Sequence, residues 1–245
     1  MRSLAGGANA SLPSVSWDWR SKRVRVVPGL FPQKAGRLLD LYAREWQGKA
    51  LKDDEFVISA DEKTSIQARR RKHPTCTCRP RTAMRVEHEY FRCGAWTYIA
   101  ALDVHHARIF GRCETQNGIA PFDRLVDQVR TRPPYNDARR AFWIVDNCSA
   151  HRGSRAVQRL QDRYPHLVLV HAPVHASWLN QVEVYFSIVQ RKVLSPNDFA
   201  NLDLLAERLL DFQYYWESTA RPFEWKFTRQ DLAALLAKIG PQPKI

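Results

Sequence analysis

Three acidic residues occupy positions from which their side chains could bind divalent cations together. Asp61 ends the largely apolar run of residues 56–60, and Asp146 ends the run of residues 141–145. Such runs are typical of buried central strands, and an acid at the C-terminal end of a strand lies at the rim where α/β proteins bind ligands. Glu183 lies in a helical pattern further along the chain. Carboxylate oxygens are the ligands that hard divalent cations prefer, so we predict that Asp61, Asp146 and Glu183 form one site.

The segment around Glu183 has the apolar spacing of one helical face, formed by Leu179, Val182, Phe186, Val189 and Val193. A second, polar stripe runs beside it and consists of Asn180, Glu183, Ser187 and Gln190. Glu183 is therefore expected where the helix turns from the core to the surface. We expect Ser177 to cap the first turn, and Arg191 and Lys192 to end the helix before Ser195-Pro196.

The elements around these acids predict a mixed sheet flanked by helices. Helical spacing covers residues 35–46, 121–129 and 157–164, and two further helices begin at Asn201 and at Thr228. Residues 96–102 and 107–111 form a hairpin pattern around Asp103, which is expected as a turn acid. The strand at 141–145, the helix at 157–164 and the strand at 167–170 make a β-α-β unit with parallel strands. This order matches the RNase H-like α/β layout.

The charge of the chain points to a polyanionic partner. The 245 residues carry a formal net charge of +13, and the sequence pI is about 9.8. Counterion release rewards basic surfaces that bind nucleic acid, although ribosome-associated and membrane-surface proteins share this bias. A basic cluster follows the first acid, and we predict that it contacts the backbone of a nucleic acid together with Lys192. The cluster consists of Arg69, Arg70, Arg71, Lys72, Arg79 and Arg81.

Composition and length favour one folded domain with an extension. Residues 34–245 carry the periodic patterns, whereas residues 1–33 form a short basic arm of poorly defined structure. Five scattered cysteines do not suggest a disulfide framework, so we expect a reducing compartment. The N-terminus lacks the apolar core of a signal peptide, and a cytoplasmic, nucleoid-associated protein is expected.

Three blocks of the sequence together resemble the acidic motifs of bacterial DDE transposases of the insertion sequence 630 type, relatives of the mariner elements. The blocks are Ala60-Asp-Glu-Lys-Thr-Ser-Ile-Gln67, Trp143-Ile-Val-Asp-Asn-Cys-Ser-Ala-His151 and His175-Ala-Ser-Trp-Leu-Asn-Gln-Val-Glu183. The second and third acids are 183 − 146 = 37 residues apart, close to the usual family spacing. The resemblance runs from about residue 34 to the C-terminus.

The resemblance implies that Asp61, Asp146 and Glu183 are the catalytic triad and bind two Mg²⁺ or Mn²⁺ ions. Asn147, His151 and Asn180 occupy motif positions beside the triad, where positioning roles are expected. The implied reaction is cleavage of a DNA phosphodiester followed by strand transfer, with transposon ends and target as double-stranded DNA partners and a possible homodimer. Because adjacent side chains of a strand face opposite ways, only Asp61 of the pair Asp61-Glu62 is expected to enter the site.

The chain departs from the family pattern before residue 34, where the usual helix-turn-helix region that reads the terminal repeats is expected to be absent. A truncated copy and one half of a split gene both explain this, and we favour the truncated copy. Two other functions remain open. One is a catalytically unproductive DNA-binding remnant, and the other is a host RNase H-like nuclease that shares only the fold.

Overall fold

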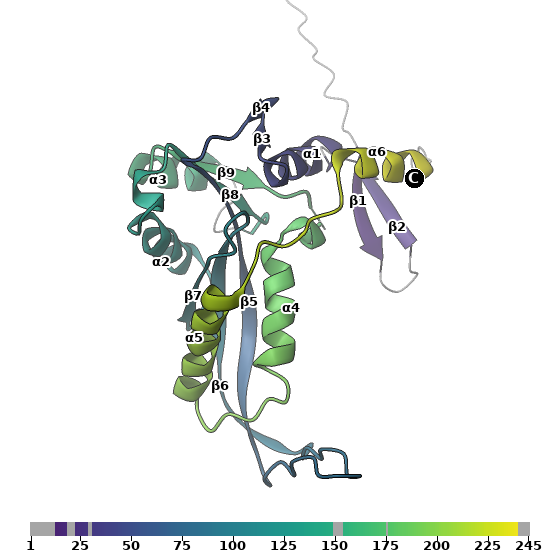
Figure 1. The fold of residues 1–245 in the computed structure, drawn as a ribbon, viewed down its shortest axis with the longest axis vertical. Coiled ribbons are helices and arrows are strands. Elements are labelled where there is room, and N and C mark those ends of the chain that lie inside the picture. Colours follow the sequence, from purple (N-terminus) through teal and green to yellow (C-terminus); the bar gives the residue numbers. More distant parts are fainter. Residues whose placement is uncertain (1–12, 19–22, 29–30, 149–153, 175, 240–245) are drawn as a thin grey trace, which may run out of the picture.

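A five-stranded sheet forms the centre of the molecule. The computed structural model describes residues 13–18, 23–28, 31–148, 154–174 and 176–239. The strand order is β7-β6-β5-β8-β9 (Figure 1), with β5 (Glu55–Arg71), β6 (Tyr90–Asp103), β7 (Ile109–Glu114), β8 (Arg140–Val145) and β9 (Leu167–His171). The pairs β5–β6 and β6–β7 are antiparallel, whereas β5–β8 and β8–β9 are parallel. The predicted mixed sheet and the predicted parallel β-α-β unit are therefore confirmed.

Helices cover both faces of this sheet because alternate residues of its strands are apolar on each side. In β5, Ile58 and Ala60 pack with α2 (Ile119–Arg130) and α3 (Ser154–Arg163), while Val57 packs on the other face with α1 (Phe31–Tyr42). That second face is also covered by α4 (Val182–Lys192), α5 (Leu202–Thr219) and α6 (Arg229–Ile239). In the described part of the chain, no helix is long and apolar enough to cross a membrane.

The predicted caps of the last two helices are confirmed. The Asn201 side chain accepts a hydrogen bond from the Leu204 backbone N–H at the start of α5. At α6, the Thr228 backbone N–H donates to Asp231 Oδ2 and the Asp231 backbone N–H donates to Thr228 Oγ1. These reciprocal bonds satisfy donors that the first turn of a helix leaves unpaired.

The expected helix over residues 35–46 is wrong in its bounds. α1 ends at Tyr42, and Trp46 lies in β3 (Glu45–Trp46), which pairs with β4 (Lys49–Ala50). Arg44 has φ 59° and Gln47 has φ 52°, and this left-handed backbone cannot continue an α-helix. Trp46 nevertheless contacts the core, because its ring lies 4.8 Å from that of Phe142 between centroids.

The expected start of the helix that carries Glu183 is also wrong. Residues Ser177–Leu179 form a 3₁₀ turn, and α4 begins only at Val182, so Ser177 does not cap it. Asn180 separates the two because its backbone is extended, with φ −88° and ψ 109°. The apolar face was predicted correctly, since Leu179, Val182, Phe186, Val189 and Val193 are all buried.

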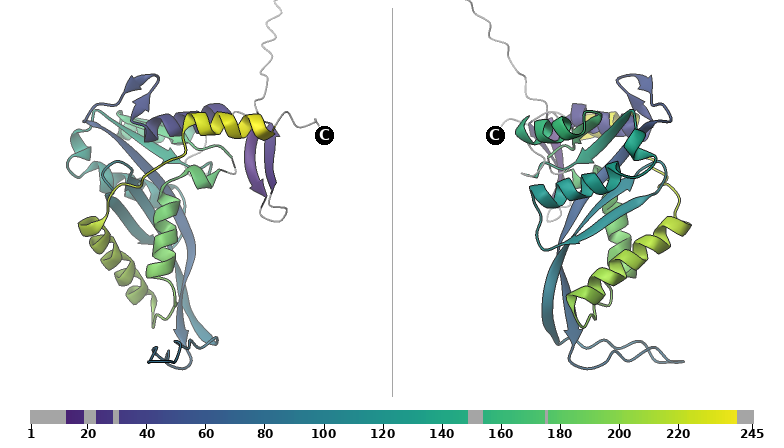
Figure 2. Two further views of the ribbon diagram at one scale, coloured as in Figure 1. Left: turned by 45° about the vertical axis from the view of Figure 1, so that its right-hand side comes forward. Right: turned by 90° about the vertical axis from the view of Figure 1, so that its left-hand side faces the viewer.

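The first strand does not end at Asp61. β5 continues to Arg71 and pairs with β6 to form a long hairpin that runs beyond the helices (Figures 1 and 2). Asp61 still lies at a rim, because the parallel neighbour β8 stops at Val145, one residue past the Ser59–Ile144 pair. A separate antiparallel pair is formed by β1 (Pro13–Asp18) and β2 (Arg23–Pro28). The sequence patterns predicted neither feature.

Asp103 is a turn acid, as predicted. Its Oδ1 accepts hydrogen bonds from the backbone N–H groups of His105 and His106, and its Oδ2 accepts one from the Tyr135 hydroxyl. The Asp103 side chain is fully buried, so these bonds replace the water it loses. The turn joins β6 to β7 and fixes their register.

Glu114 at the end of β7 links the sheet to α2 and makes the fold sensitive to acid. It accepts hydrogen bonds from Arg124 and Arg112, and the Arg124 bond is the main reason that the pKa of Glu114 is lowered. A lowered folded-state pKa contributes stability above the unfolded pKa, and this is lost as pH falls through the folded pKa. We expect Glu114→Gln to reduce the free energy of unfolding by about 1 kcal/mol near neutral pH, since the arginines are partly exposed.

Urea unfolding of the wild type and the variant near pH 7 and near pH 3 checks this, and the difference should shrink at the acid pH. The exposed α5 residue Glu207 provides the control, since Glu207→Gln should leave the unfolding free energy unchanged at both. An equal loss for Glu114→Gln at both pH values would contradict the assignment.

Candidate active site

The three predicted acids come from three different elements that meet where β8 ends. Asp61 lies in β5, Asp146 directly follows β8, and Glu183 lies in the first turn of α4. The parallel register pairs Ser59 with Ile144, so two residues further on Asp61 and Asp146 come side by side. All three acids are half-buried.

A buried polar network holds α4 against β5 beneath these acids. Asn180 and Ser59 are 1% and 0% exposed, and the Ser59 hydroxyl donates to Asn180 Oδ1. The Asn180 amide donates to the Ala60 carbonyl at 3.0 Å and to Asp61 Oδ2 at 3.2 Å. The Val182 backbone N–H, at the start of α4, donates to Ser59 Oγ at 2.8 Å. The network therefore fixes the distance between the strand that carries Asp61 and the helix that carries Glu183.

The acids share one electrostatic environment. Burial, together with the smaller effect of the Asp146 and Glu183 charges, raises the pKa of Asp61 to about 7, although a hydrogen bond from the Glu62 backbone lowers it. The pKa of Glu183 is also raised, first by burial, while Lys63 lowers it and Asp146 raises it. Neighbouring carboxylates repel one another when they are charged, and a bound cation removes this repulsion. The charged form of the group is therefore stabilised when a cation binds. Oxygen donors of this kind fit Mg²⁺ or Mn²⁺.

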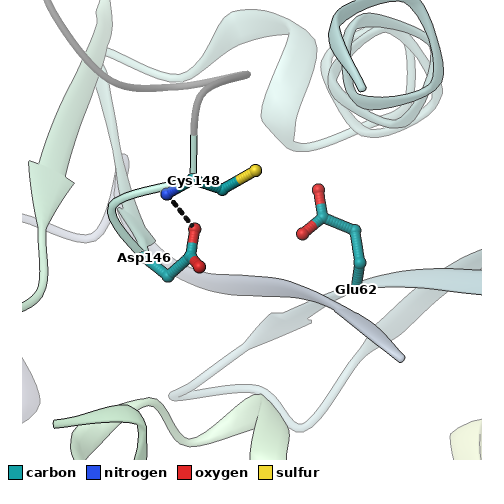
Figure 3. A group of neighbouring side chains, drawn as sticks. All are labelled: Glu62, Asp146 and Cys148. Carbon is teal, nitrogen blue, oxygen red and sulfur yellow. Dashed lines mark hydrogen bonds between the residues drawn. The ribbon is translucent and has the colours of Figure 1, made fainter. Parts of the chain in front are cut away.

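Glu62 also approaches the site. Among the described residues, one group of acid, histidine or cysteine side chains has its ligand atoms within 4.8 Å of one another, and it consists of Glu62, Asp146 and Cys148 (Figure 3). Asp61 and Glu183 are not part of that group. The expectation that only Asp61 of the Asp61-Glu62 pair reaches the site is therefore too narrow, because the Asp146 loop at the strand end is accessible from both faces of β5.

Of the residues predicted to support the triad, two have defined contacts. Asn180 belongs to the network described above. Asn147 donates from Nδ2 to the Ala172 carbonyl at 2.7 Å, which fastens the loop after β8 to the end of β9. His151 lies outside the described residues.

The predicted DNA-binding residues gather mainly at the far end of the β5–β6 hairpin, in a segment that we call the basic hairpin (residues 69–92). The guanidinium of Arg69 lies 4.6 Å from the centroid of the Tyr90 ring, and that of Arg70 lies 5.3 Å from the Phe91 ring. Such stacking orients long cationic side chains. Three of the cations have local polar partners: Arg69 donates to Gln67 Oε1, Arg71 donates to the Glu87 and Asn197 carbonyls, and Lys72 pairs with Glu89.

The remaining predicted cations are exposed: Arg79 and Arg81 at the turn of the basic hairpin, and Lys192 at the end of α4. Arg70 lies about 30 Å from Asp61, given nine strand residues at roughly 3.3 Å each, and Arg79 and Arg81 lie further along the basic hairpin. The cluster therefore does not adjoin the acids, although it follows Asp61 closely in the sequence.

Sequence reasoning missed Ser59, Glu62 and Cys148. Ser59 interrupts an apolar run two residues before Asp61, and the period of a strand puts it on the same face, which is a usable signal. Glu62 was not expected in the site, because adjacent side chains of a strand face opposite ways. Cys148 lies in a loop, where no periodicity reports the direction of a side chain.

Comparison with protein families matches residues 57–206 to the family described as DDE superfamily endonuclease. Comparison with curated proteins finds no match. Among solved structures, the catalytic domain of Mos1 mariner transposase matches with TM-score 0.55 and 12% identity, covering 87% of this chain and 93% of that chain. The Mos1 catalytic domain with Raltegravir and Mn matches with TM-score 0.55 and 13% identity, covering 87% and 94%.

The Mos1 mariner paired end complex with Mn matches with TM-score 0.51 and 13% identity, covering 87% of this chain and 63% of that chain. This chain therefore spans less than two thirds of the length of the Mos1 chain in that complex. At these identities the likeness shows the fold, and it confirms the predicted RNase H-like mixed sheet with flanking helices.

The Asn180 network leads to a stability prediction. Asn180→Ala should lower the free energy of unfolding by roughly 1–3 kcal/mol, because the Ser59 hydroxyl and the Ala60 carbonyl lose a partner while buried. Guanidinium unfolding followed by circular dichroism measures this. The matched control is Gln190→Ala, which shortens an exposed side chain on the same segment and should change stability by less than about 0.5 kcal/mol. Equal effects of the two substitutions would show that the network does not anchor α4.

Proposed function

Because the chain belongs to the DDE superfamily endonucleases, we propose that it is the catalytic part of a bacterial transposase of the insertion sequence 630 type. It cuts DNA phosphodiesters at transposon ends and joins the freed ends to target DNA. The observation that supports this most is the convergence of Asp61, Asp146 and Glu183, whose charges act on one another. These are the acids of the three sequence blocks that resemble that group.

The proposed cofactor is Mg²⁺ or Mn²⁺, bound by these three carboxylates. When bound, a pair of such ions activates a water molecule on one side of the phosphodiester and stabilises the leaving 3′-oxygen on the other. Two similar structures are those of the Mos1 catalytic domain and Raltegravir with Mn and with Mg, which agrees with an all-oxygen donor set here.

The other residues of the chain would position the acids and the DNA. Asn180 holds Asp61 and the start of α4 in one arrangement, and Asn147 holds the loop of Asp146. A site that is fixed in advance loses little free energy to reorganisation when the substrate binds. For strand transfer, the same carboxylates would act with a DNA 3′-hydroxyl in place of water. No side chain needs to become a covalent nucleophile.

The basic hairpin is the proposed DNA-binding extension. Arg70, Arg79 and Arg81 are exposed, and the exposed Phe91 stacks with Arg70. Arginines in such positions contact phosphates without reading sequence. Arg70 lies about 30 Å from Asp61, roughly nine base pairs of B-DNA, so these contacts would orient a duplex whose cleaved bond lies at the site.

The catalytic proposal is tested by nicking of supercoiled plasmid with Mg²⁺ or Mn²⁺. Asp61→Asn, Asp146→Asn and Glu183→Gln should each reduce nicking by at least about 100-fold, because each removes a charged ligand that the metals require. The matched control is Asp211→Asn on the exposed face of α5, which should nick like the wild type.

A second readout does not depend on turnover. Mn²⁺ should raise the thermal unfolding temperature of the wild type and of Asp211→Asn, but not of Asp146→Asn. Metal-dependent nicking that survives all three triad substitutions would refute the triad. A folded wild type that binds Mn²⁺ and DNA without nicking would favour an unproductive remnant, and a preference for RNA–DNA hybrids would favour a host nuclease.

The DNA-binding proposal is tested by the salt dependence of affinity for a linear duplex. Replacing Arg70, Arg79 and Arg81 together by Gln should weaken binding and reduce the slope of log K against log salt by roughly 0.9 for each lost phosphate contact. The control replaces three cations that are exposed elsewhere, Arg37, Arg208 and Lys226, and keeps the same net charge as the test variant. Identical slopes for the two variants would show that net charge, and not the basic hairpin, determines binding.

A further inference from the structure

Cys148 brings a thiol to the carboxylates at the end of β8. Its Sγ, a carboxylate oxygen of Asp146 and a carboxylate oxygen of Glu62 all lie within 4.8 Å of one another. In Figure 3, the Cys148 thiol and the Glu62 carboxylate point toward the same space, with Asp146 beside them. All three side chains are half-buried, so the group is open to an ion from solvent.

Hydrogen bonds within the loop fix the backbone that carries Cys148. The Cys148 backbone N–H donates to Asp146 Oδ1 at 2.8 Å, and the Asn147 amide donates to the Ala172 carbonyl at 2.7 Å. The first bond closes a tight turn between two of the three donors, and the second anchors the turn to the end of β9. The turn therefore holds Cys148 beside Asp146, and the sulfur lies within 4.8 Å of an Asp146 carboxylate oxygen.

This donor set differs from the all-oxygen set of the proposed catalytic site. Thiolate sulfur favours Zn²⁺ and Cd²⁺ over Mg²⁺. Zinc binds sulfur at about 2.3 Å and carboxylate oxygen at about 2.0–2.2 Å, so donors around one zinc ion lie roughly 3.5 Å apart. The present spacing of up to 4.8 Å exceeds that value by roughly 1 Å, so the donors would have to approach one another slightly to bind one ion.

We propose that Glu62, Asp146 and Cys148 form a binding site for a thiophilic divalent cation such as Zn²⁺. Asp146 belongs to this site and to the proposed catalytic triad, so a thiophilic cation competes with Mg²⁺ or Mn²⁺ for it. The proposal that a cation binds here depends only on the arrangement of these three side chains. The competition rests on the proposed function, since it needs Asp146 to bind the catalytic metal.

The other described cysteines lie elsewhere and set the design of the test. Cys76 and Cys78 are exposed near the turn of the basic hairpin, whereas Cys93 and Cys113 are half-buried in β6 and β7. Burial raises the pKa of Cys113 to about 12, which keeps it a thiol. The parent protein for the test therefore carries Cys76→Ser and Cys78→Ser, which remove the two exposed thiols.

The probe is Cd²⁺, whose bond to a thiolate gives an ultraviolet charge-transfer absorption. The parent should show a saturable signal that Cys148→Ser abolishes and that Cys113→Ser, the matched control, retains. Glu62→Gln should weaken Cd²⁺ binding by more than about tenfold, the loss that follows removal of even an outer partner of a metal site. A signal that persists in Cys148→Ser, or an unchanged affinity in Glu62→Gln, would overturn the proposal.

Two further measurements test whether the Cys148→Ser variant is folded and whether the two cations compete. Cd²⁺ should raise the unfolding temperature of the parent but not of Cys148→Ser, and both proteins must show the same circular dichroism spectrum without metal. Cd²⁺ should also displace bound Mn²⁺, followed by electron paramagnetic resonance, in the parent and not in Cys148→Ser. Mn²⁺ retained in Cd²⁺-saturated parent would overturn the shared role of Asp146. None of these signals requires DNA cleavage. An inactive wild type would therefore contradict the proposed function and not the proposed cation site.

Discussion

The contact between Asn180 and β5 is the constraint on which the arrangement of the acids depends. A strand and a helix approach each other there through polar groups that water cannot reach, and each donor or acceptor is satisfied by a partner on the other element. Buried polar bonds are directional and are costly when unmade. They fix the relative position of β5 and α4 more narrowly than apolar packing would, because apolar packing tolerates sliding.

This contact also explains why Glu183 can sit in the first turn of its helix although no side chain caps that helix. The extended backbone at Asn180 interrupts the chain between the 3₁₀ turn and α4, and its side chain turns back to the strand. The start of the helix is thereby tied to Ser59 instead of to a local cap. An acid in a first turn is further favoured by the helix dipole. The position of Glu183 is thus determined by tertiary contacts rather than by its own segment.

Much of the fold follows from sequence patterns that repeat over many residues. The helical face from Leu179 to Val193, the apolar runs of β5 and β8, and the caps at Asn201 and Thr228 were all predicted, since each has a local physical cause. The long continuation of β5 was not, because residues 62–71 are mostly polar and gain their strand structure from pairing with β6. The end of α1 escaped prediction as well, since left-handed backbone at Arg44 and Gln47 has no side-chain signature there.

At the site, the three acids were predicted from the sequence, whereas the side chains that lie beside them were not. The environment shared by Asp61, Asp146 and Glu183 agrees with the expectation from strand ends and one helix. The approach of Glu62 and Cys148 to Asp146 could not be foreseen, because it depends on how the chain turns after β8. Loop direction is set by individual hydrogen bonds, here those of Asn147 and Cys148, and these have no periodic signal.

The irregular pairing within the long hairpin has a consequence for how the chain can vary in length. The β5–β6 register shifts between Lys63 and Ile66 and again between Gln67 and Arg69, and each shift resets which face the following side chains occupy. Beyond the second shift, insertion of one residue in each strand would invert the hairpin and turn its arginines to the opposite side. Insertion of two in each would preserve the face and lengthen the reach by about 7 Å. Natural relatives should therefore differ in hairpin length by even steps, with the cationic side conserved.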